Sequence, residues 1–160
     1  MVRDPAAFRK RIGLVGCVKS KLSRPARARD LYTSPLFVGR RRWVERTCES
    51  WFILSAKYGL VGPEQVVEPY DQTLARMSSE ERRAWSRSVV AALRAQLHDL
   101  SAYTFEIHAG AAYFDVGLKD SLVAEGAAVE IPSQHLRLGE QRALYRRARA
   151  TAEWMRTPND

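Results

Sequence analysis

The chain has 160 residues and a formal net charge of +8, which favours partners that carry phosphate, such as a nucleotide or nucleic acid. No apolar run reaches the roughly 18–20 residues of a membrane span, and the charged N-terminus lacks the apolar core of a secretory signal, so we expect a cytoplasmic protein without a membrane partner. The 2 cysteines are too few for a disulfide framework or a zinc site, and we expect residues 1–160 to form a single α/β domain with no metal or cofactor.

The first half of the chain predicts two strands, each followed by a helix. Residues 12–17 and 51–56 contain no charge and are typical of strands buried on both faces. Ser34 and Pro35 fit the cap and first position of a helix that ends near Cys48. Its buried face should include Leu36, Trp43, Val44 and Thr47, and its exposed face Arg40, Arg41, Arg42 and Glu45. The spacing of Ser78 and Glu81 predicts a capping box at the start of a helix that runs to about His98.

The second half repeats this alternation. Residues 104–109 predict a third strand, and Gly110 begins the turn into a helix that ends near Gly126. Residues 127–131 predict a fourth strand and residues 139–155 a final helix. We therefore predict a three-layer αβα fold with a small, mainly parallel four-stranded sheet, as in flavodoxin-like proteins.

Ligands of open parallel sheets bind just beyond the carboxyl ends of the strands, so the residues that follow each predicted strand are candidates for a binding site. The first strand is followed by Cys17, Lys19, Ser20 and Lys21, and the second by Ser55, Lys57, Tyr58 and Gly59. The third is followed by Gly110 and Tyr113, and the fourth by residues 132–135. We expect these groups to share one edge of the sheet.

The lysines of this edge predict a positively charged pocket for a phosphate, a carboxylate or an electron-rich ring. A lysine packed beside another cation can lose its proton and act as a nucleophile, which makes Lys21 a candidate catalytic residue; the simpler interpretation is a solvated loop lysine. Cys17 is either a small core residue or a thiolate favoured by Lys19 and Lys21. We interpret His108, inside the third strand, as a structural histidine.

The long connection after residues 51–56 contains a further candidate, the segment Glu68-Pro69-Tyr70-Asp71. Tyr70 could stack on a ring, and Asp71 could activate water or bind the edge of a base. The alternative is that Asp71 only caps the turn before residues 73–77.

Several motifs of the chain resemble, in the same order, those of a family of uncharacterised bacterial and phage domains. They are CVKSK at 17–21, LYTSPLF at 31–37, SAKYGL at 55–60, PYD at 69–71 and GAAY at 110–113. The family is distantly similar to the peroxide-stress YaaA proteins, which are associated with DNA binding. It is also similar to the base-modifying domain of archaeosine synthase, whose fold is likened to uracil-DNA glycosylases. The resemblance implies a uracil-DNA-glycosylase-like fold over residues 12–145.

In archaeosine synthase a lysine of the loop that contains the cysteine adds to the nitrile of a deazaguanine, and Lys21 is the residue that matches it best. Leu22-Ser23-Arg24 stands where that enzyme has Lys-Pro-Tyr. We therefore predict an enzyme directed at a nucleobase, which cleaves or transfers an N-glycosidic bond or modifies the base, with Lys21 and Asp71 as its catalytic residues. Two alternatives stay open: a nucleic-acid-binding module without catalysis, and a biosynthetic enzyme for a phosphorylated small molecule.

Overall fold

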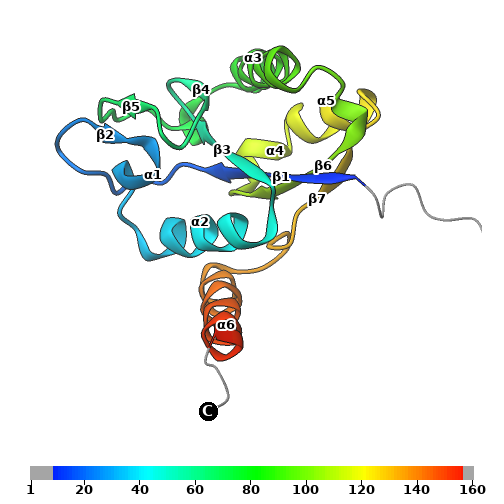
Figure 1. Ribbon diagram of the computed structural model, residues 1–160. Helices are drawn as coiled ribbons and strands as arrows, with labels where there is room; N and C mark the ends of the chain where they lie inside the picture. Colours follow the sequence, from blue (N-terminus) through cyan, green and yellow to red (C-terminus); the bar gives the residue numbers. More distant parts are fainter. Residues whose placement is uncertain (1–8, 157–160) are drawn as a thin grey trace, which may run out of the picture.

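The computed structural model describes the backbone of residues 9–156 and the side chains of residues 9–147. Its centre is a 5-stranded sheet in the order β4-β3-β1-β6-β7 (Figure 1). The parallel strands are β1 (Lys10–Gly16), β3 (Ser50–Ser55), β6 (Tyr103–His108) and β7 (Ala128–Glu130). These are the four strands that the sequence predicts, so the mainly parallel sheet is confirmed.

Helices cover both faces of the sheet, which confirms the three-layer αβα architecture. Helices α2 (Pro35–Thr47) and α6 (Leu138–Arg156) lie together on one face, and α3 (Ser79–Leu97) and α5 (Leu118–Ala124) lie together on the other (Figure 1). The core between these layers is apolar, with Leu14, Ile53, Phe105 and Ile107 fully buried on the central strands. Burial of both faces explains why the predicted strands have no alternating polar residues.

Short elements account for most differences from the predicted fold. Strand β4 (Gly59–Val61) pairs antiparallel with β3, because Gly59 adopts a φ of +71° that reverses the chain. The prediction of one continuous helix after Gly110 is wrong. The chain forms two helices instead, α4 (Ala111–Phe114) and α5, and Gly117 between them has a φ of +102°. The remaining elements are β2 (Ala26–Arg27), α1 (Ala28–Leu31), β5 (Val66–Val67), η2 (Leu74–Arg76) and η3 (Leu100–Ala102).

The prediction that Arg40 lies on the outside of its helix is wrong. The buried residues of α2 are Phe37, Arg40 and Val44, and only 4% of the Arg40 surface is exposed. Helix α6 covers this part of α2, and a Cβ at Gly39 would lie 2.8 Å from the Cβ of Tyr145 on α6. The close approach of α6, which the spacing within α2 cannot reveal, therefore buries Arg40.

The capping box at the start of α3 is confirmed. Glu81 donates its backbone N–H to Ser78 Oγ at 3.1 Å, and Glu81 Oε2 accepts the backbone N–H of Ser78 at 2.7 Å. We expect Ser78→Ala to lower the free energy of unfolding by about 1 kcal/mol, because the backbone N–H of Glu81 loses its side-chain acceptor. Urea unfolding of this variant beside Ser79→Ala, one residue further on, checks it. Equal stability of the two variants would contradict the role of the cap.

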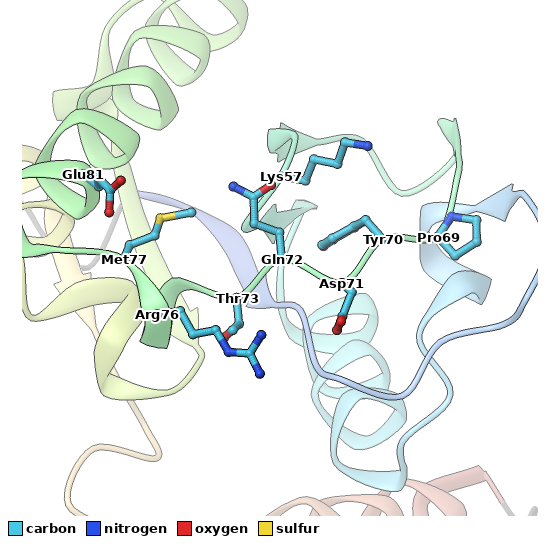
Figure 2. Close-up of a pocket in the computed structure, with 9 residues that line it drawn as sticks. All are labelled: Lys57, Pro69, Tyr70, Asp71, Gln72, Thr73, Arg76, Met77 and Glu81. Atoms are coloured by element: carbon cyan, nitrogen blue, oxygen red, sulfur yellow. The ribbon is translucent and has the colours of Figure 1, made fainter.

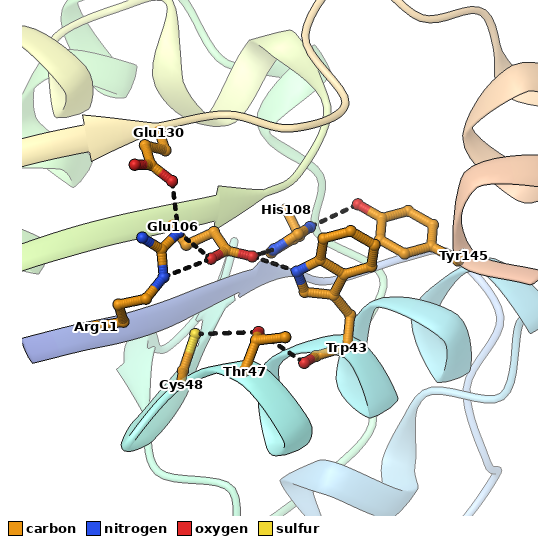
Figure 3. Close-up of polar contacts among 8 residues, drawn as sticks. All are labelled: Arg11, Trp43, Thr47, Cys48, Glu106, His108, Glu130 and Tyr145. Carbon is orange, nitrogen blue, oxygen red and sulfur yellow. Dashed lines mark hydrogen bonds and ion pairs between the residues drawn. The ribbon is translucent and has the colours of Figure 1, made fainter. Parts of the chain in front are cut away.

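A buried ionic network joins β6 to β1, α2 and α6 (Figure 3). Glu106 on β6 is 2% exposed, and it accepts hydrogen bonds from Arg11 Nε at 3.1 Å and from Trp43 Nε1. His108 Nε2 lies 2.6 Å from Glu106 Oε1, and His108 Nδ1 lies 2.6 Å from the Tyr145 hydroxyl. The network joins the sheet to the two helices on one of its faces, next to the carboxyl end of β6.

Candidate functional site

The order of the parallel strands makes the carboxyl ends of β1 and β6 a topological switch point of the sheet. The chain leaves β1 toward α2 on one face of the sheet, and it leaves β6 toward α4 and α5 on the other face (Figure 1). In doubly wound sheets, the point where neighbouring connections diverge in this way is the usual ligand site. The residues that follow these two strands are Cys17 and Tyr113, together with their neighbours.

Cys17 and Tyr113 contact each other directly at this point. The Cys17 thiol lies 2.6 Å from the Tyr113 hydroxyl, which in turn donates to the Cys17 carbonyl at 3.2 Å. The ring of Trp85 packs edge-on against Tyr113, with centroids 5.7 Å apart. Cys17 is a buried free thiol whose position is fixed by its contact with Tyr113.

A second group of hydroxyls lies at the end of β3. Ser55 Oγ accepts the backbone N–H of Tyr58 at 3.0 Å and donates to the Tyr70 hydroxyl at 2.8 Å. The hydroxyls of Tyr70 and Tyr32 are 2.7 Å apart. The two groups adjoin, since the Cys17 thiol is close enough to the Tyr70 hydroxyl to influence its titration. We call Cys17, Tyr32, Ser55, Tyr70 and Tyr113 the hydroxyl cluster.

The tyrosines of the hydroxyl cluster remain protonated at neutral pH. Burial raises the pKa of Tyr32 to about 12. Burial also raises the pKa of Tyr70, and the neighbouring Cys17 and Tyr32 raise it further. The pKa of Tyr113 is raised by burial and then by Cys17. Because a phenolate is disfavoured at each position, the cluster presents hydrogen-bond donors.

Tyr32 and Tyr70 have two phenolic hydrogens between them, and the contact between the two residues uses only one. Tyr70 already accepts from Ser55, and the contact between Tyr32 and Tyr70 uses one of their two phenolic hydrogens. The other phenolic hydrogen has the Cys17 sulfur or Ser55 as its neighbouring acceptor, according to which tyrosine carries it. A carbonyl oxygen or ring nitrogen of a ligand would be a stronger acceptor than sulfur.

Lys21 lies over the hydroxyl cluster. Its Nζ is 4.6 Å from the centre of the Tyr70 ring and 5.7 Å from that of Tyr32, and it donates to the Lys19 carbonyl at 3.3 Å. Its backbone is fixed by a bridge to Tyr32 and by the bond from Leu22 N–H to the Leu31 carbonyl at 2.8 Å. The loop after β1 therefore holds the Lys21 ammonium over the rings of Tyr70 and Tyr32.

An open groove of about 560 Å³ begins beside Tyr70 (Figure 2). Its lining residues are Lys57, Pro69, Tyr70, Asp71, Gln72, Thr73, Arg76, Met77 and Glu81. Figure 2 shows Asp71 and Arg76 extending to the same side of the segment that carries them, whereas Lys57 extends away from both. The exposed face of Tyr58, 38% exposed, adjoins this groove by packing edge-on against Tyr70 at 5.5 Å.

The structure brings together most, but not all, of the predicted site residues. Cys17, Ser55, Tyr70 and Tyr113 belong to the hydroxyl cluster, and Lys21 lies over its Tyr70 ring. Tyr58 and Asp71 lie at the groove, Lys57 lines it while pointing outward, and Gly59 starts β4. Lys19, Ser20 and Gly110 are exposed, the last as the cap of α4.

Sequence reasoning missed two residues of the site, Tyr32 and Arg76. Tyr32 is 3% exposed and bonds to Tyr70 from a turn that has no periodic pattern. The bridge between Lys21 and Tyr32 is the feature that brings it to the site, and only its place inside the LYTSPLF motif could have pointed to it. Arg76 lines the groove from the short helix η2, and its proximity to Asp71 in the sequence was the available signal.

Two kinds of site are not found in the part of the chain that the structure describes. No three His, Cys, Asp or Glu side chains among these residues gather as potential metal ligands. Within residues 9–156, every helix is too short or too polar to cross a bilayer.

These features define a three-layer αβα protein whose candidate site lies at the carboxyl edge of a parallel sheet, where a lysine covers a cluster of hydroxyls. The chain belongs to the family described as DUF6884, a family of unknown function, whose model matches residues 12–147. It is similar to YfjM of Bacillus subtilis (strain 168), described as an uncharacterised protein, with 35% identity over 71 residues. The match covers 40% of this chain and 47% of that relative. No solved structure matches the chain.

Proposed function

We propose that the protein is an enzyme that acts on the base of a nucleotide or nucleic acid, in the first instance by hydrolysing its N-glycosidic bond. The observation that carries this proposal is the position of Lys21 Nζ, 4.6 Å above the ring of Tyr70, whose neighbour in the chain is Asp71. Lys21 is thus a proton donor over the Tyr70 ring, and Asp71 is a carboxylate that lines the groove beside the same tyrosine.

The groove has the size and lining that such a substrate needs. Its volume of about 560 Å³ is within the range of roughly 300–1,000 Å³ that is usual for small-ligand sites. The exposed ring of Tyr58 offers a face for stacking a base, and the guanidinium of Arg76 offers paired donors for a phosphate. A phenolic hydrogen of the hydroxyl cluster can leave the Cys17 sulfur, a weak acceptor, and donate instead to a carbonyl or ring nitrogen of the base.

The proposed reaction adds water across the glycosidic bond. As the bond from the sugar carbon to the base nitrogen breaks, its electron pair moves to the nitrogen, which takes a proton from the Lys21 ammonium. The Asp71 carboxylate stabilises the positive charge that develops on the sugar and accepts the proton of the attacking water. Solvent then returns the proton from Asp71 to Lys21. The distant resemblance of the family to the base-modifying domain of archaeosine synthase, in which Lys21 best matches the lysine that attacks the base, supports this class of substrate.

The direct test incubates the full chain with nucleotides, single-stranded DNA and double-stranded DNA, and measures released base by chromatography. We expect release from at least one of these substrates, and we expect Asp71→Asn to reduce it about 100-fold, because the base for water and the counter-charge for the sugar are both lost. Asp120→Asn, an exposed aspartate on α5, is the matched control and should retain full activity.

Two outcomes would contradict the proposal. Equal base release by the Asp71→Asn and Asp120→Asn variants would remove the assigned role of Asp71. Nucleic-acid binding that weakens steeply with salt, with no base released from any substrate, would instead indicate a binding module.

A further inference from the structure

Two buried polar atoms lack a partner, and both lie near the carboxyl edge of the sheet. Among the side chains that the structure describes, the buried nitrogen and oxygen atoms without a hydrogen-bond partner are Arg40 Nε and Ser133 Oγ. Arg40 is 4% exposed and Ser133 is 3% exposed. Ser133 belongs to the turn after β7, and Arg40 lies on α2 close enough to Cys17 and Tyr113 for its charge to act on them. Unpaired buried polar groups are rare, so two in one region indicate a missing partner.

Arg40 also has no counter-ion among the side chains of residues 9–147. Its Nη2 donates to the neutral amide oxygen of Gln141 on α6 at 3.0 Å, and the Tyr145 hydroxyl is its other polar neighbour on that helix. It makes none of the ion pairs of arginine found among the described side chains, which instead involve Arg11, Arg27, Arg29, Arg41 and Arg94. Because a guanidinium keeps its proton even where burial lowers its pKa, as at Arg40, the charge stays and requires an anion.

The nearby Tyr145 cannot serve as that anion. Glu106 is ionised, since the hydrogen bonds from His108 and Arg11 outweigh the effect of burial and lower its pKa to about 2. The ionised Glu106 therefore accepts the Nε2–H of His108, which leaves Nδ1 to accept the hydrogen of the Tyr145 hydroxyl at 2.6 Å. Burial also raises the pKa of Tyr145, so the group next to Arg40 and Ser133 is a neutral phenol.

We propose that Arg40 and Ser133 form a binding site for a single oxyanion group, a phosphate or a carboxylate, beneath α6 at the carboxyl edge of the sheet. The planar guanidinium matches the two oxygens of such a group through Nε and Nη2, and the Ser133 hydroxyl supplies a third donor. The anion displaces the Gln141 amide, which occupies one of these positions. None of the three side chains lines the groove beside Tyr70, and the site does not depend on the proposed reaction.

The site is tested by the thermal unfolding of the full chain in inorganic phosphate and in chloride of equal ionic strength and pH. We expect phosphate to raise the melting temperature by about 4 °C in a saturable manner, since the anion binds only the folded chain. Acetate and ribose 5-phosphate, tested in the same way, distinguish a carboxylate and a phosphate ester from free phosphate. A rise with any one of the three supports the site and identifies its ligand chemistry.

Two variants make the test specific. Gln141→Glu places a carboxylate beside Arg40, so we expect a higher melting temperature in chloride and no further rise in phosphate. Ser133→Ala removes one donor and should reduce the apparent affinity for phosphate about tenfold. Arg42→Met, an exposed arginine on the same helix, should leave the phosphate effect unchanged. The proposal is overturned if no anion stabilises the wild type beyond chloride, or if the rise is the same in all four proteins, which would mean an adventitious ion only.

Discussion

Replacing Glu106 with glutamine should lower the free energy of unfolding by about 3 kcal/mol or more at pH 7. The variant keeps the size of the side chain but removes the charge that Arg11, Trp43 and His108 share, and the amide presents a second donor to partners that are themselves donors. Glu130→Gln is the matched control, because Glu130 also pairs with Arg11 but is exposed. It should cost less than about 1 kcal/mol. Urea unfolding of the three proteins measures both effects.

The stability that Glu106 contributes should also depend on pH. Its pKa falls from 4.5 to about 2 in the folded chain, because the hydrogen bonds from His108 and Arg11 outweigh burial. A carboxyl group with a lowered pKa stabilises the folded state above pH 4.5, and this contribution is lost as the pH falls from 4.5 through about 2. The total is about 3 kcal/mol.

The difference between wild type and Glu106→Gln isolates this effect, since other carboxyl groups titrate equally in both proteins. We expect the difference in unfolding free energy to be constant from pH 7 to about pH 5 and to shrink steadily below pH 4.5. A difference that stays the same down to about pH 2 would show that Glu106 does not hold its charge in the folded chain.

Lys21→Ala should reduce base release at least about 100-fold with little change in stability. The Lys21 ammonium is a proton donor that lies over the Tyr70 ring, and among the described residues its contacts are a carbonyl and two ring faces rather than an ion pair. Removing it leaves the backbone bridge to Tyr32 in place, so the loop should keep its conformation. Initial rates on the substrate identified in the release assay, together with the melting temperature, give the measurement.

Two further lysine variants separate the roles that a cation can play. Lys21→Arg keeps a positive charge near Tyr70 but does not release a proton at neutral pH, so it should remain as inactive as Lys21→Ala if the lysine donates to the base. Lys19→Ala removes an exposed lysine of the same loop and should retain activity. Full activity in Lys21→Arg would mean that the charge alone is needed, and full activity in Lys21→Ala would remove Lys21 from the mechanism.

The larger elements of the fold were predictable because their signals are local. Buried strands have charge-free runs, and α2 and α3 begin with Ser34 and Ser78, whose caps the structure confirms. Strand β4 was not predictable in the same way, because its three residues are too few for a periodic pattern and its pairing depends on the left-handed Gly59. The burial of Arg40 was not predictable from the spacing within α2, because it results from contact with α6, about 100 residues further along the chain.

The sequence could predict where on the sheet the candidate site lies, but it could predict only some of the contacts between the side chains of the site. Parallel strands bring their carboxyl ends to one edge, so the sequence could place Cys17 and Tyr113 near each other. It could not show that Tyr70 reaches Ser55 and Tyr32, because that contact depends on the path of the connection between β4 and η2. Lys57 follows a strand as predicted, yet side-chain direction in a turn has no sequence signal, and the residue points outward.

The two outer strands of the sheet have a consequence for how the protein behaves in concentrated solution. Strand β4 spans Gly59–Val61 and β7 spans Ala128–Glu130, so each border offers few free N–H and C=O groups to a strand from another molecule. Glu130 also places a charged residue on β7, where it pairs with Arg11. Short edge strands, one of which is charged, disfavour edge-to-edge pairing of sheets from different molecules, so the fold itself resists aggregation.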